Sequence, residues 1–253
     1  MKIFVIGAGT WGTALSEVLA FNGNHVTLWH YRQEMAEELQ ATRKHPILDQ
    51  AIIHPNISVI FNLSNIPKNS RIVLAIPSHC FEKILPELAL LNPKIVICAS
   101  KGLDHTKGQL LSQSIYEIMN IKKDKIVVLS GPSHAEDVFN KQPTAIVSAC
   151  IDVKNSVKIQ NLFSNQYFRV YTSQDVKGVE IGGAVKNIIA LSAGIIQGLG
   201  LGDNSVAALV TRGLQEIIRL GVFWGADAKT FSGLSGIGDL MVTCYSLHSR
   251  NRN

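Results

Sequence analysis

The chain has 253 residues, of which 46% are hydrophobic and 17% charged, a balance that predicts a globular protein and excludes a disordered one. The formal net charge of +5 is scattered, without a basic stripe interleaved with aromatic residues, so we expect no nucleic-acid partner. The longest apolar stretch, residues 188–196, is too short to cross a bilayer, which predicts no membrane insertion. The 4 cysteines are widely separated and form no metal-ligand pattern, which predicts a reduced, cytoplasmic protein that binds no metal.

The N-terminal segment combines an apolar run, a glycine-rich turn and a helical pattern. Residues 2–6 are typical of a buried strand, and residues 13–19 have helical spacing. Between them, Gly7, Gly9 and Gly12 form a G-x-G-x-x-G pattern. In this context the glycines permit a tight turn, close approach of the backbone to a pyrophosphate, and packing of helix on strand. The segment predicts a dinucleotide site; the alternative is a turn in an α/β protein with no ligand.

Strand and helix patterns then alternate as far as residue 175. This alternation predicts a Rossmann-type α/β fold with a doubly wound, mostly parallel sheet covered on both faces. Chemistry is then expected beyond the carboxyl ends of the strands, where such sheets bind their ligands. The expected strands are residues 2–6, 25–29, 57–61, 71–76, 95–99, 126–129, 144–148 and 168–171, and the expected helices include 33–43, 80–91 and 109–119.

The pattern changes near residue 176, because no strand signal follows it. Long helices are expected at residues 178–197 and 204–223, followed by a glycine-rich loop at 232–239. We therefore place a dinucleotide-binding domain at residues 1–176 and an all-α second domain at residues 177–253.

The end of the second expected strand bears on the choice of cofactor. NAD-binding sites usually have an acidic residue there, which binds the ribose 2′-hydroxyl. This chain has His30, Tyr31 and Arg32 instead. Because a guanidinium suits a phosphate dianion, we expect a preference for NADP, with NAD as the possible alternative cofactor. The competing interpretation is that Arg32 is simply the exposed start of a helix.

Two lysines stand out by their surroundings. Lys101 leaves a buried strand into a turn of small residues, where it could reach a phosphate or a carbonyl, although a surface lysine is common there. Lys186 lies in a nearly apolar helix, where an unpaired ammonium is costly to bury. Desolvation would lower its pKa toward the range useful for general acid–base catalysis, and Asn187 could orient a hydroxyl. The alternative is a lysine whose head extends to the surface.

Further polar residues follow in the second domain. Asp239 comes after a glycine-rich segment, and it could cap a helix or pair with Lys186. Thr243 lies one turn further along that helix. The segment Ser249-Arg250-Asn251 has the composition of a phosphate clamp, and a frayed basic tail is the alternative.

Five segments of the chain resemble the signatures of bacterial NAD(P)-dependent sn-glycerol-3-phosphate dehydrogenases. They are residues 7–14, 130–136, 178–187, 231–240 and 248–252. The resemblance covers the whole chain with its motifs in order. It implies reversible reduction of dihydroxyacetone phosphate, a triose phosphate, to sn-glycerol 3-phosphate, which supplies glycerophospholipid synthesis.

The resemblance also implies roles for individual residues. Lys186 would be the proton donor and acceptor at the substrate C2 oxygen, with Thr243 nearby. The substrate would be contacted by Lys101, Gly131, Ser133, Lys186, Asn187, Asp239, Ser249, Arg250 and Asn251. With the glycines of the opening turn, the cofactor would be contacted by Thr10, Trp11, Tyr31, Arg32, Lys101, Ala135 and Arg250. A homodimer is one possible assembly.

The chain departs from the family pattern in two places. Residues 47–50 stand where the family often has a Tyr-Leu-Pro-Gly turn, so we expect a tyrosine contact to the cofactor to be missing. Family chains also continue for several helices beyond the Ser-Arg-Asn motif and use a late acidic residue on the cofactor. We therefore expect an incomplete helical domain with exposed apolar surface, and poor activity of the 253-residue chain.

Two other functions agree with parts of the pattern. One is a Rossmann-plus-helical dehydrogenase acting on a hydroxy acid, because such enzymes also use a lysine in a glycine-rich helix. The Gly-Pro-Ser turn and the Ser-Arg-Asn clamp favour a phosphorylated triose over that substrate. The other is a protein that binds NADP without turnover. Activity with dihydroxyacetone phosphate against hydroxyacid-related ketones separates these alternatives.

Overall fold

The computed structural model of the protein describes residues 1–48 and 52–246, and its centre is one large sheet. The strand order is β10-β9-β8-β5-β4-β1-β2-β3. Neighbouring strands are parallel from β3 to β8 and between β9 and β10, whereas β8 and β9 run antiparallel. The strands of this sheet are β1 (Lys2–Ile6), β2 (His25–Trp29), β3 (Ile57–Ile60), β4 (Arg71–Leu74), β5 (Ile95–Cys98), β8 (Ile126–Ser130), β9 (Thr144–Ala149) and β10 (Phe168–Ser173). This arrangement confirms the expected mostly parallel α/β fold.

Helices alternate with the strands and then follow them without interruption. The helices are α1 (Thr10–Phe21), α2 (Gln33–Thr42), α3 (Phe81–Ala89), α4 (Leu111–Met119), α5 (Ala135–Phe139), α6 (Val153–Phe163), α7 (Val176–Gly198), α8 (Asp203–Phe223) and α9 (Asp239–Tyr245). A 3₁₀ turn (Ala228–Ser232) and a π-helical turn (Leu234–Gly238) connect α8 to α9.

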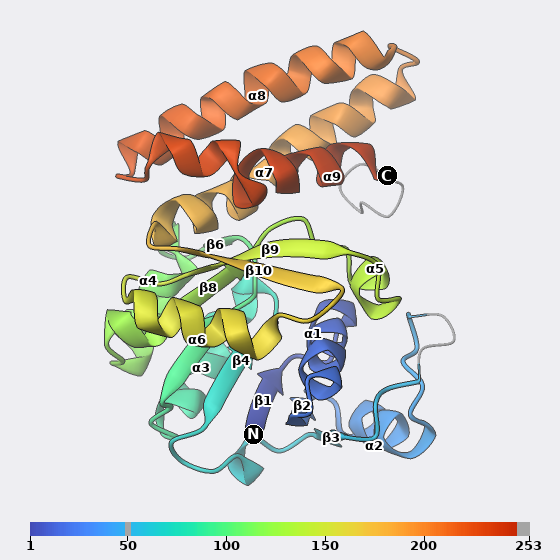
Figure 1. The fold of residues 1–253 in the computed structure, drawn as a ribbon, viewed down its shortest axis with the longest axis vertical. Coiled ribbons are helices and arrows are strands. Elements are labelled where there is room, and N and C mark those ends of the chain that lie inside the picture. Colours follow the sequence, from blue (N-terminus) through green and yellow to red (C-terminus); the bar gives the residue numbers. More distant parts are fainter. Residues whose placement is uncertain (49–51, 247–253) are drawn as a thin grey trace.

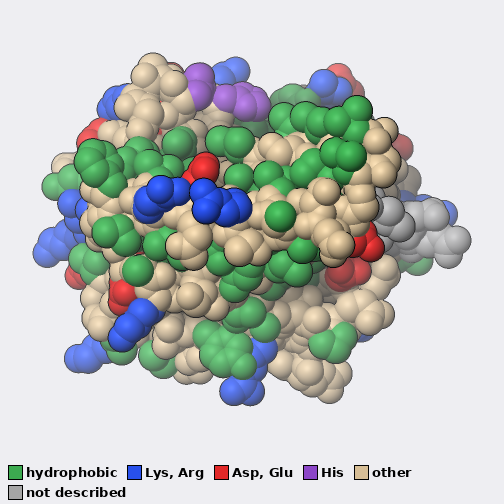
Figure 2. All heavy atoms as spheres, turned by 90° about the horizontal axis from the view of Figure 1, so that it is seen from above, with side chains coloured by type: hydrophobic (Ala, Val, Ile, Leu, Met, Phe, Trp, Pro, Cys, Tyr) green, Lys and Arg blue, Asp and Glu red, His purple; other side chains and the backbone are tan. Residues whose placement is uncertain are grey.

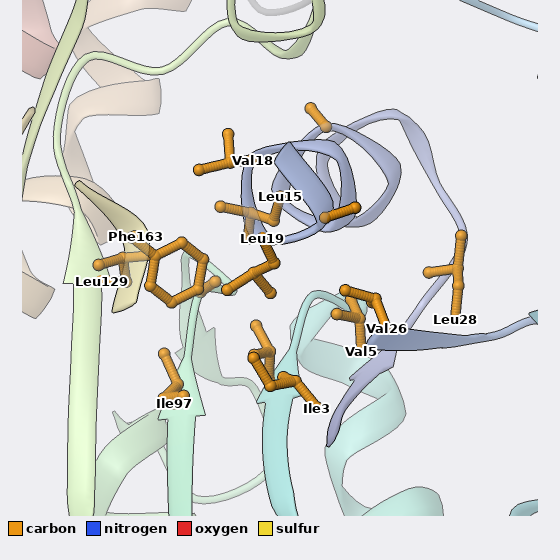
Figure 3. Close-up of a cluster of buried hydrophobic side chains, with 14 of the residues drawn as sticks. Ile3, Val5, Leu15, Val18, Leu19, Val26, Leu28, Ile97, Leu129 and Phe163 are labelled. Atoms are coloured by element: carbon orange, nitrogen blue, oxygen red, sulfur yellow. The ribbon is translucent and has the colours of Figure 1, made fainter. Parts of the chain in front are cut away.

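The sheet is buried on both faces (Figure 1). On one face, α1 and α6 pack on β1 and its neighbours, and Figure 3 shows Leu15 and Leu19 of α1 together with Phe163 of α6 above Ile3. On the other face, side chains of α3 and α4, including Phe81, pack on the same strands. Each such fully buried apolar side chain contributes roughly 1.5–3 kcal/mol to folding. The two cores fix the strand ends, where the polar residues lie.

Helices α7, α8 and α9 form a separate layer beyond the carboxyl ends of the parallel strands (Figure 1). Small residues bring this layer together. A Cβ on Gly221 of α8 would lie 2.1 Å from the ring of Phe231, and one on Gly182 of α7 would lie 2.2 Å from the carbonyl oxygen of Ser235. Larger side chains at either glycine would therefore push the glycine-rich segment away from its helix. Gly182 and its neighbour cost helix propensity, and this close approach is the physical reason for them.

One face of α7 is apolar and exposed. Ile188, Leu191 and Ile195 follow helical spacing and are 68%, 58% and 57% exposed. Figure 2, a view onto the helical layer, shows hydrophobic side chains spread between basic ones. The expected exposed apolar surface on the helical part is thus present. With 23 residues and a mean hydropathy of 1.5, α7 also has the length and apolarity of a membrane-spanning helix, although 44% of its most apolar window is buried and core helices of soluble proteins meet the same test.

The helix expected over residues 109–119 starts later than predicted. Gln109 and Leu110 belong to strand β7, which pairs antiparallel with β6 (Leu103–Asp104), and α4 begins at Leu111. The buried carboxylate of Asp104 explains this hairpin. It accepts hydrogen bonds from the amides of Thr106 and Lys107 and from the hydroxyl of Ser114. The contacts to Thr106 and Lys107 close the turn between β6 and β7, and the contact to Ser114 ties the hairpin to α4.

Candidate active site

The glycine-rich turn after β1 has the geometry of an anion cradle. Gly7 has a φ of +115°, and a Cβ there would lie 2.5 Å from the carbonyl oxygen of Ala75. A Cβ on Gly12 would lie 1.8 Å from the carbonyl oxygen of Gly7, so α1 packs directly on the turn. A Cβ on Gly9 would meet nothing within 4 Å. Gly9 caps α1 without a side-chain hydrogen bond, so the positive end of this helix faces open space. These features fit the pyrophosphate of a dinucleotide.

Two side chains hold the turn in place. Trp11, one of the residues expected on the cofactor, donates its indole N–H to the carbonyl oxygen of Ala99 at 3.0 Å. His45, which the sequence did not single out, lies with Nε2 3.3 Å from the carbonyl oxygen of Ala8. Its Nδ1 accepts the amides of Ile47 and Leu48, so Nε2 carries the proton and donates to the turn. Burial lowers the pKa of His45, which favours this neutral form. No motif marks such a histidine in the sequence.

The residues after β2 form an exposed stack beside the turn. The rings of His30 and Tyr31 are stacked with centroids 5.0 Å apart, and the Arg32 guanidinium lies 5.1 Å from the centre of the Tyr31 ring. Tyr31 is 66% exposed. Arg32 also directly precedes α2, which agrees with the alternative that it is simply the exposed start of a helix. The stack presents a planar cation at the strand end where the 2′ position of a dinucleotide ribose is read.

A charged cluster of Lys101, Lys186 and Asp239 lies between the sheet and the helical layer. Asp239, the first residue of α9, is fully buried. One carboxylate oxygen accepts Lys101 Nζ from beyond β5 at 2.8 Å, and the other accepts Lys186 Nζ from α7 at 2.5 Å. Lys186 also donates to the hydroxyl of Thr243 at 2.7 Å. The structure therefore joins residues far apart in sequence around one carboxylate.

The surroundings of Lys186 in this cluster bring its pKa closer to neutral pH. Lys186 is 6% exposed, so it does not extend to the surface. Burial, with the neighbouring charge of Lys101, lowers the pKa of Lys186 to about 8, and the attraction of Asp239 opposes that shift. Without Asp239 the two ammonium groups would face each other in a poorly solvated site. The carboxylate is what permits both lysines to be there.

Lys101 connects the cluster to the turn after β8. Its Nζ donates to the carbonyl oxygen of Gly131 at 3.0 Å and to the hydroxyl of Ser133 at 3.3 Å. Gly131 has a φ of +145°, and a Cβ there would lie 2.9 Å from the Cα of Ile146. Only glycine fits this turn without strain, which keeps the carbonyl oxygen aimed at Lys101.

The remaining expected site residues are distributed as follows. Asn187 adjoins Lys186 in α7, and Ala135 begins α5 and is buried. Thr10 begins α1 at the glycine turn. Ser249, Arg250 and Asn251 lie outside the described residues. In the described part of the chain, no group of three or more His, Cys, Asp or Glu residues is arranged to hold a metal ion.

Comparison with known proteins identifies the family. The family model described as the NAD-dependent glycerol-3-phosphate dehydrogenase N-terminus matches residues 2–156, and the model of the C-terminus matches residues 175–253. The chain is 46% identical over 255 residues to the glycerol-3-phosphate dehydrogenase [NAD(P)+] of Lysinibacillus sphaericus and 47% identical over 253 residues to that of Oceanobacillus iheyensis. These matches cover 99% of this chain and 75% and 74% of the two relatives.

Solved structures agree with this assignment. The crystal structure of glycerol-3-phosphate dehydrogenase from Coxiella burnetii superposes with a TM-score of 0.90 and 35% identity, covering 99% of this chain and 78% of that one. A D-mandelate dehydrogenase structure superposes with a TM-score of 0.66 at 14% identity, a likeness of fold alone. The glycine turn, the buried lysine cluster and these matches lead to one conclusion: the chain belongs to the NAD-dependent glycerol-3-phosphate dehydrogenase family of oxidoreductases.

Proposed function

We propose that Lys186 supplies the proton in the reduction of dihydroxyacetone phosphate to sn-glycerol 3-phosphate, the reaction of the family to which this chain belongs. The single observation that carries the proposal is the buried Asp239 carboxylate, which holds Lys186 and Lys101 on its two oxygens. This brings two ammonium groups together near the carboxyl ends of β5 and β8. A ketone bearing a phosphate suits such a site, because it is an anion and its carbonyl oxygen gains negative charge during reduction.

Lys186 acts as a general acid in the reductive direction. With a pKa lowered to about 8, it is mostly an ammonium at neutral pH and yet gives up a proton more readily than an exposed lysine. Hydride transfer to C2 would be the chemistry that a bound nicotinamide supplies, and Lys186 Nζ would give its proton to the C2 oxygen. Oxidation reverses the step, and neutral Lys186 accepts the hydroxyl proton. Asp239 and Thr243 hold the Nζ in both protonation states.

The other expected residues position the substrate. Lys101 stabilises negative charge on the substrate while its own Nζ is held by the turn after β8. Ser133 and the Gly131 carbonyl oxygen border the proposed substrate site on the side of the turn after β8. Asn187 orients the substrate hydroxyl from α7. The segment Ser249-Arg250-Asn251 binds the phosphate in this proposal, which rests for these residues on the sequence pattern.

The cofactor is a nicotinamide dinucleotide, and within that class we favour NADP. Gly7, Gly9 and Gly12 would hold the pyrophosphate at the N-terminus of α1, with Thr10 and Trp11 beside it. Arg32 would bind the 2′-phosphate, and Tyr31 beside it would contact the same end of the cofactor. The open space at Gly9 and the exposed guanidinium at the end of β2 support this placement.

Several further expectations remain predictions. They are the domain division at residues 1–176 and 177–253, the contact of Ala135 and Arg250 with the cofactor, a cytoplasmic location without membrane insertion, and a possible homodimer. The supply of glycerophospholipid synthesis follows from the family reaction.

Steady-state kinetics test the proposal. Purified protein is assayed for oxidation of NADPH with dihydroxyacetone phosphate, and in parallel with small 2-keto acids. We expect turnover with the triose phosphate and none with the keto acids. A preference for keto acids, or binding of NADPH without turnover of any of these ketones, would contradict the proposed substrate.

A further inference from the structure

Glu180 is a buried carboxylate that the proposed chemistry does not use. It lies in the second turn of α7, six residues before Lys186, and is 8% exposed. In the described part of the chain no ion pair involves it. Burying an acidic side chain without a cationic partner is costly, so its contacts need an explanation.

Its contacts reach across to the dinucleotide-binding part of the molecule. The amide of Ser112 donates to one carboxylate oxygen of Glu180 at 2.9 Å, and the hydroxyl of Ser112 donates to the other. Ser112 lies in the first turn of α4, whose own capping residue, Leu110, provides no side-chain hydrogen bond. Glu180 therefore supplies, from α7, the N-terminal cap that α4 lacks. The positive end of α4 compensates part of the cost of burying the charge.

These hydrogen bonds also favour the ionised form of Glu180. Burial raises the pKa of Glu180 to about 7, and the bonds from Ser112 oppose that rise. Breaking them would favour the neutral acid or leave a buried charge unsatisfied. Either outcome weakens the contact between α7 and α4.

This contact lies between the two lysines along the chain. From Ser112 the chain leads back through the β6–β7 hairpin to Lys101, and from Glu180 it leads along α7 to Lys186. Midway, Gly183 packs on the active-site side, where an added Cβ would lie 2.8 Å from the hydroxyl of Ser130 and 3.6 Å from Cγ of Lys101. A shift of α7 on α4 would therefore move Lys186 relative to Lys101.

We propose that Glu180 is a positioning residue, which fixes Lys186 against Lys101 by capping α4 from α7. The inference rests on the proposed role of Lys186 in proton transfer. Catalytic geometry is sensitive to such supports, since a misplacement of about 1 Å can lower the rate by roughly 10²-fold.

The test uses two substitutions at one position. Glu180→Leu removes both acceptors at similar volume. Glu180→Gln keeps the contact, because its carbonyl oxygen accepts the Ser112 amide and its side-chain amide donates to the Ser112 hydroxyl. We expect Glu180→Leu to lower kcat by about 10-fold or more, with the Kd of NADPH changed less than about 2-fold, and Glu180→Gln to stay within about 3-fold of the wild type. Ser112→Ala, which removes one of the two bonds, should give a smaller loss in the same direction.

A second readout does not depend on turnover. Reductive methylation followed by mass spectrometry reports the protection of Lys186, which is buried in the native protein. We expect faster methylation of Lys186 in Glu180→Leu than in wild type or Glu180→Gln. Asp152→Ala is the matched control, since Asp152 caps α6, a helix other than α4 and α7, through the amide of Lys154. It should lower thermal stability without changing kcat or the methylation of Lys186.

The outcomes separate the two proposals. A folded Glu180→Leu protein with wild-type kcat and wild-type protection of Lys186 would overturn the positioning role. So would a Glu180→Gln protein as impaired as Glu180→Leu, because the charge rather than the contact would then be required. If the wild type fails to turn over dihydroxyacetone phosphate, the proposed function fails, and the methylation rates still decide whether Glu180 holds Lys186.

Discussion

The proposed nucleotide end and the proposed proton-transfer end of the site are built by different means. At the nucleotide end, backbone amides and glycines within one short segment, residues 7–12, make the cradle. At the proton-transfer end, the side chains of Lys101, Lys186 and Asp239 come from three elements and meet at one carboxylate. A backbone cradle depends on local conformation, whereas a side-chain cluster depends on how separate elements pack. The two ends should therefore respond differently to substitution, and the following experiments test that difference.

The largest effect is expected from removing the proposed acid. Lys186→Met keeps the length of the side chain and removes the ammonium, so turnover should fall by about 10³-fold, within the range that general acid–base groups supply. The Kd of NADPH, measured by fluorescence titration, should change little because the glycine cradle is untouched. Lys177→Met, an exposed lysine in the same helix, is the control and should leave kcat unchanged. Retained turnover in Lys186→Met would remove this residue from the chemistry.

Asp239→Asn should affect catalysis and stability together. An asparagine offers one acceptor oxygen in place of two, so one lysine would lose its carboxylate partner in the buried site. Breaking a buried ion pair costs about 3–5 kcal/mol, which should appear as a lower Tm, and kcat should fall by roughly 10²-fold. Asp227→Asn, at the exposed cap of the turn Ala228–Ser232, is the matched control. An unchanged Tm in Asp239→Asn would show that the carboxylate is not needed to hold the two lysines.

Arg32→Gln tests the choice between the two cofactors. Hydrogen bonds to charged groups contribute about 1.5–3 kcal/mol, so the KM for NADPH should rise about 10-fold or more. The KM for NADH should change much less, because NADH has no 2′-phosphate. A wild-type protein that clearly prefers NADH would contradict the assignment of Arg32 to the 2′-phosphate.

Gly9→Ala tests the backbone cradle without disturbing the fold. Its new methyl group would meet no protein atom within 4 Å, so Tm should be unchanged. It would instead project into the space proposed for the pyrophosphate and raise the KM for NADPH by about 10-fold, or about 1.4 kcal/mol. Gly198→Ala, which also adds a methyl group in open space, is the control at the end of α7. An equal KM in both variants would argue against the cradle.

The smallest effect is expected from pH. In the proposed reduction Lys186 donates a proton, so kcat should fall as pH rises through about 8, where Lys186 loses its charge. In the oxidative direction Lys186 must accept a proton, so kcat should rise over the same range. Parallel pH profiles in both directions would show that another group controls the reaction.

The sequence predicted the fold because its signals are local. Mostly apolar runs predicted every strand of the large sheet, because central strands such as β1, β5 and β8 are buried on both faces and need such runs. The β6–β7 hairpin was missed because Asp104 forms it through contacts that no periodic pattern encodes. The direction of β9 relative to β8 could not be predicted either, because the same apolar run suits both directions.

The sequence by itself determined the glycine-rich turn after β1, because Gly7 supplies its positive φ and Gly12 leaves no Cβ between α1 and the turn. It also indicated that Lys186 lies in an apolar helix. Only the tertiary structure decided that Asp239 holds Lys186 and Lys101 together, and that Glu180 caps a helix of the other layer. The reason is physical: a lysine is tolerated in a buried site only with its partner, and that partner is 53 residues away in sequence. Packing of the helical layer on the strand ends brings the two together.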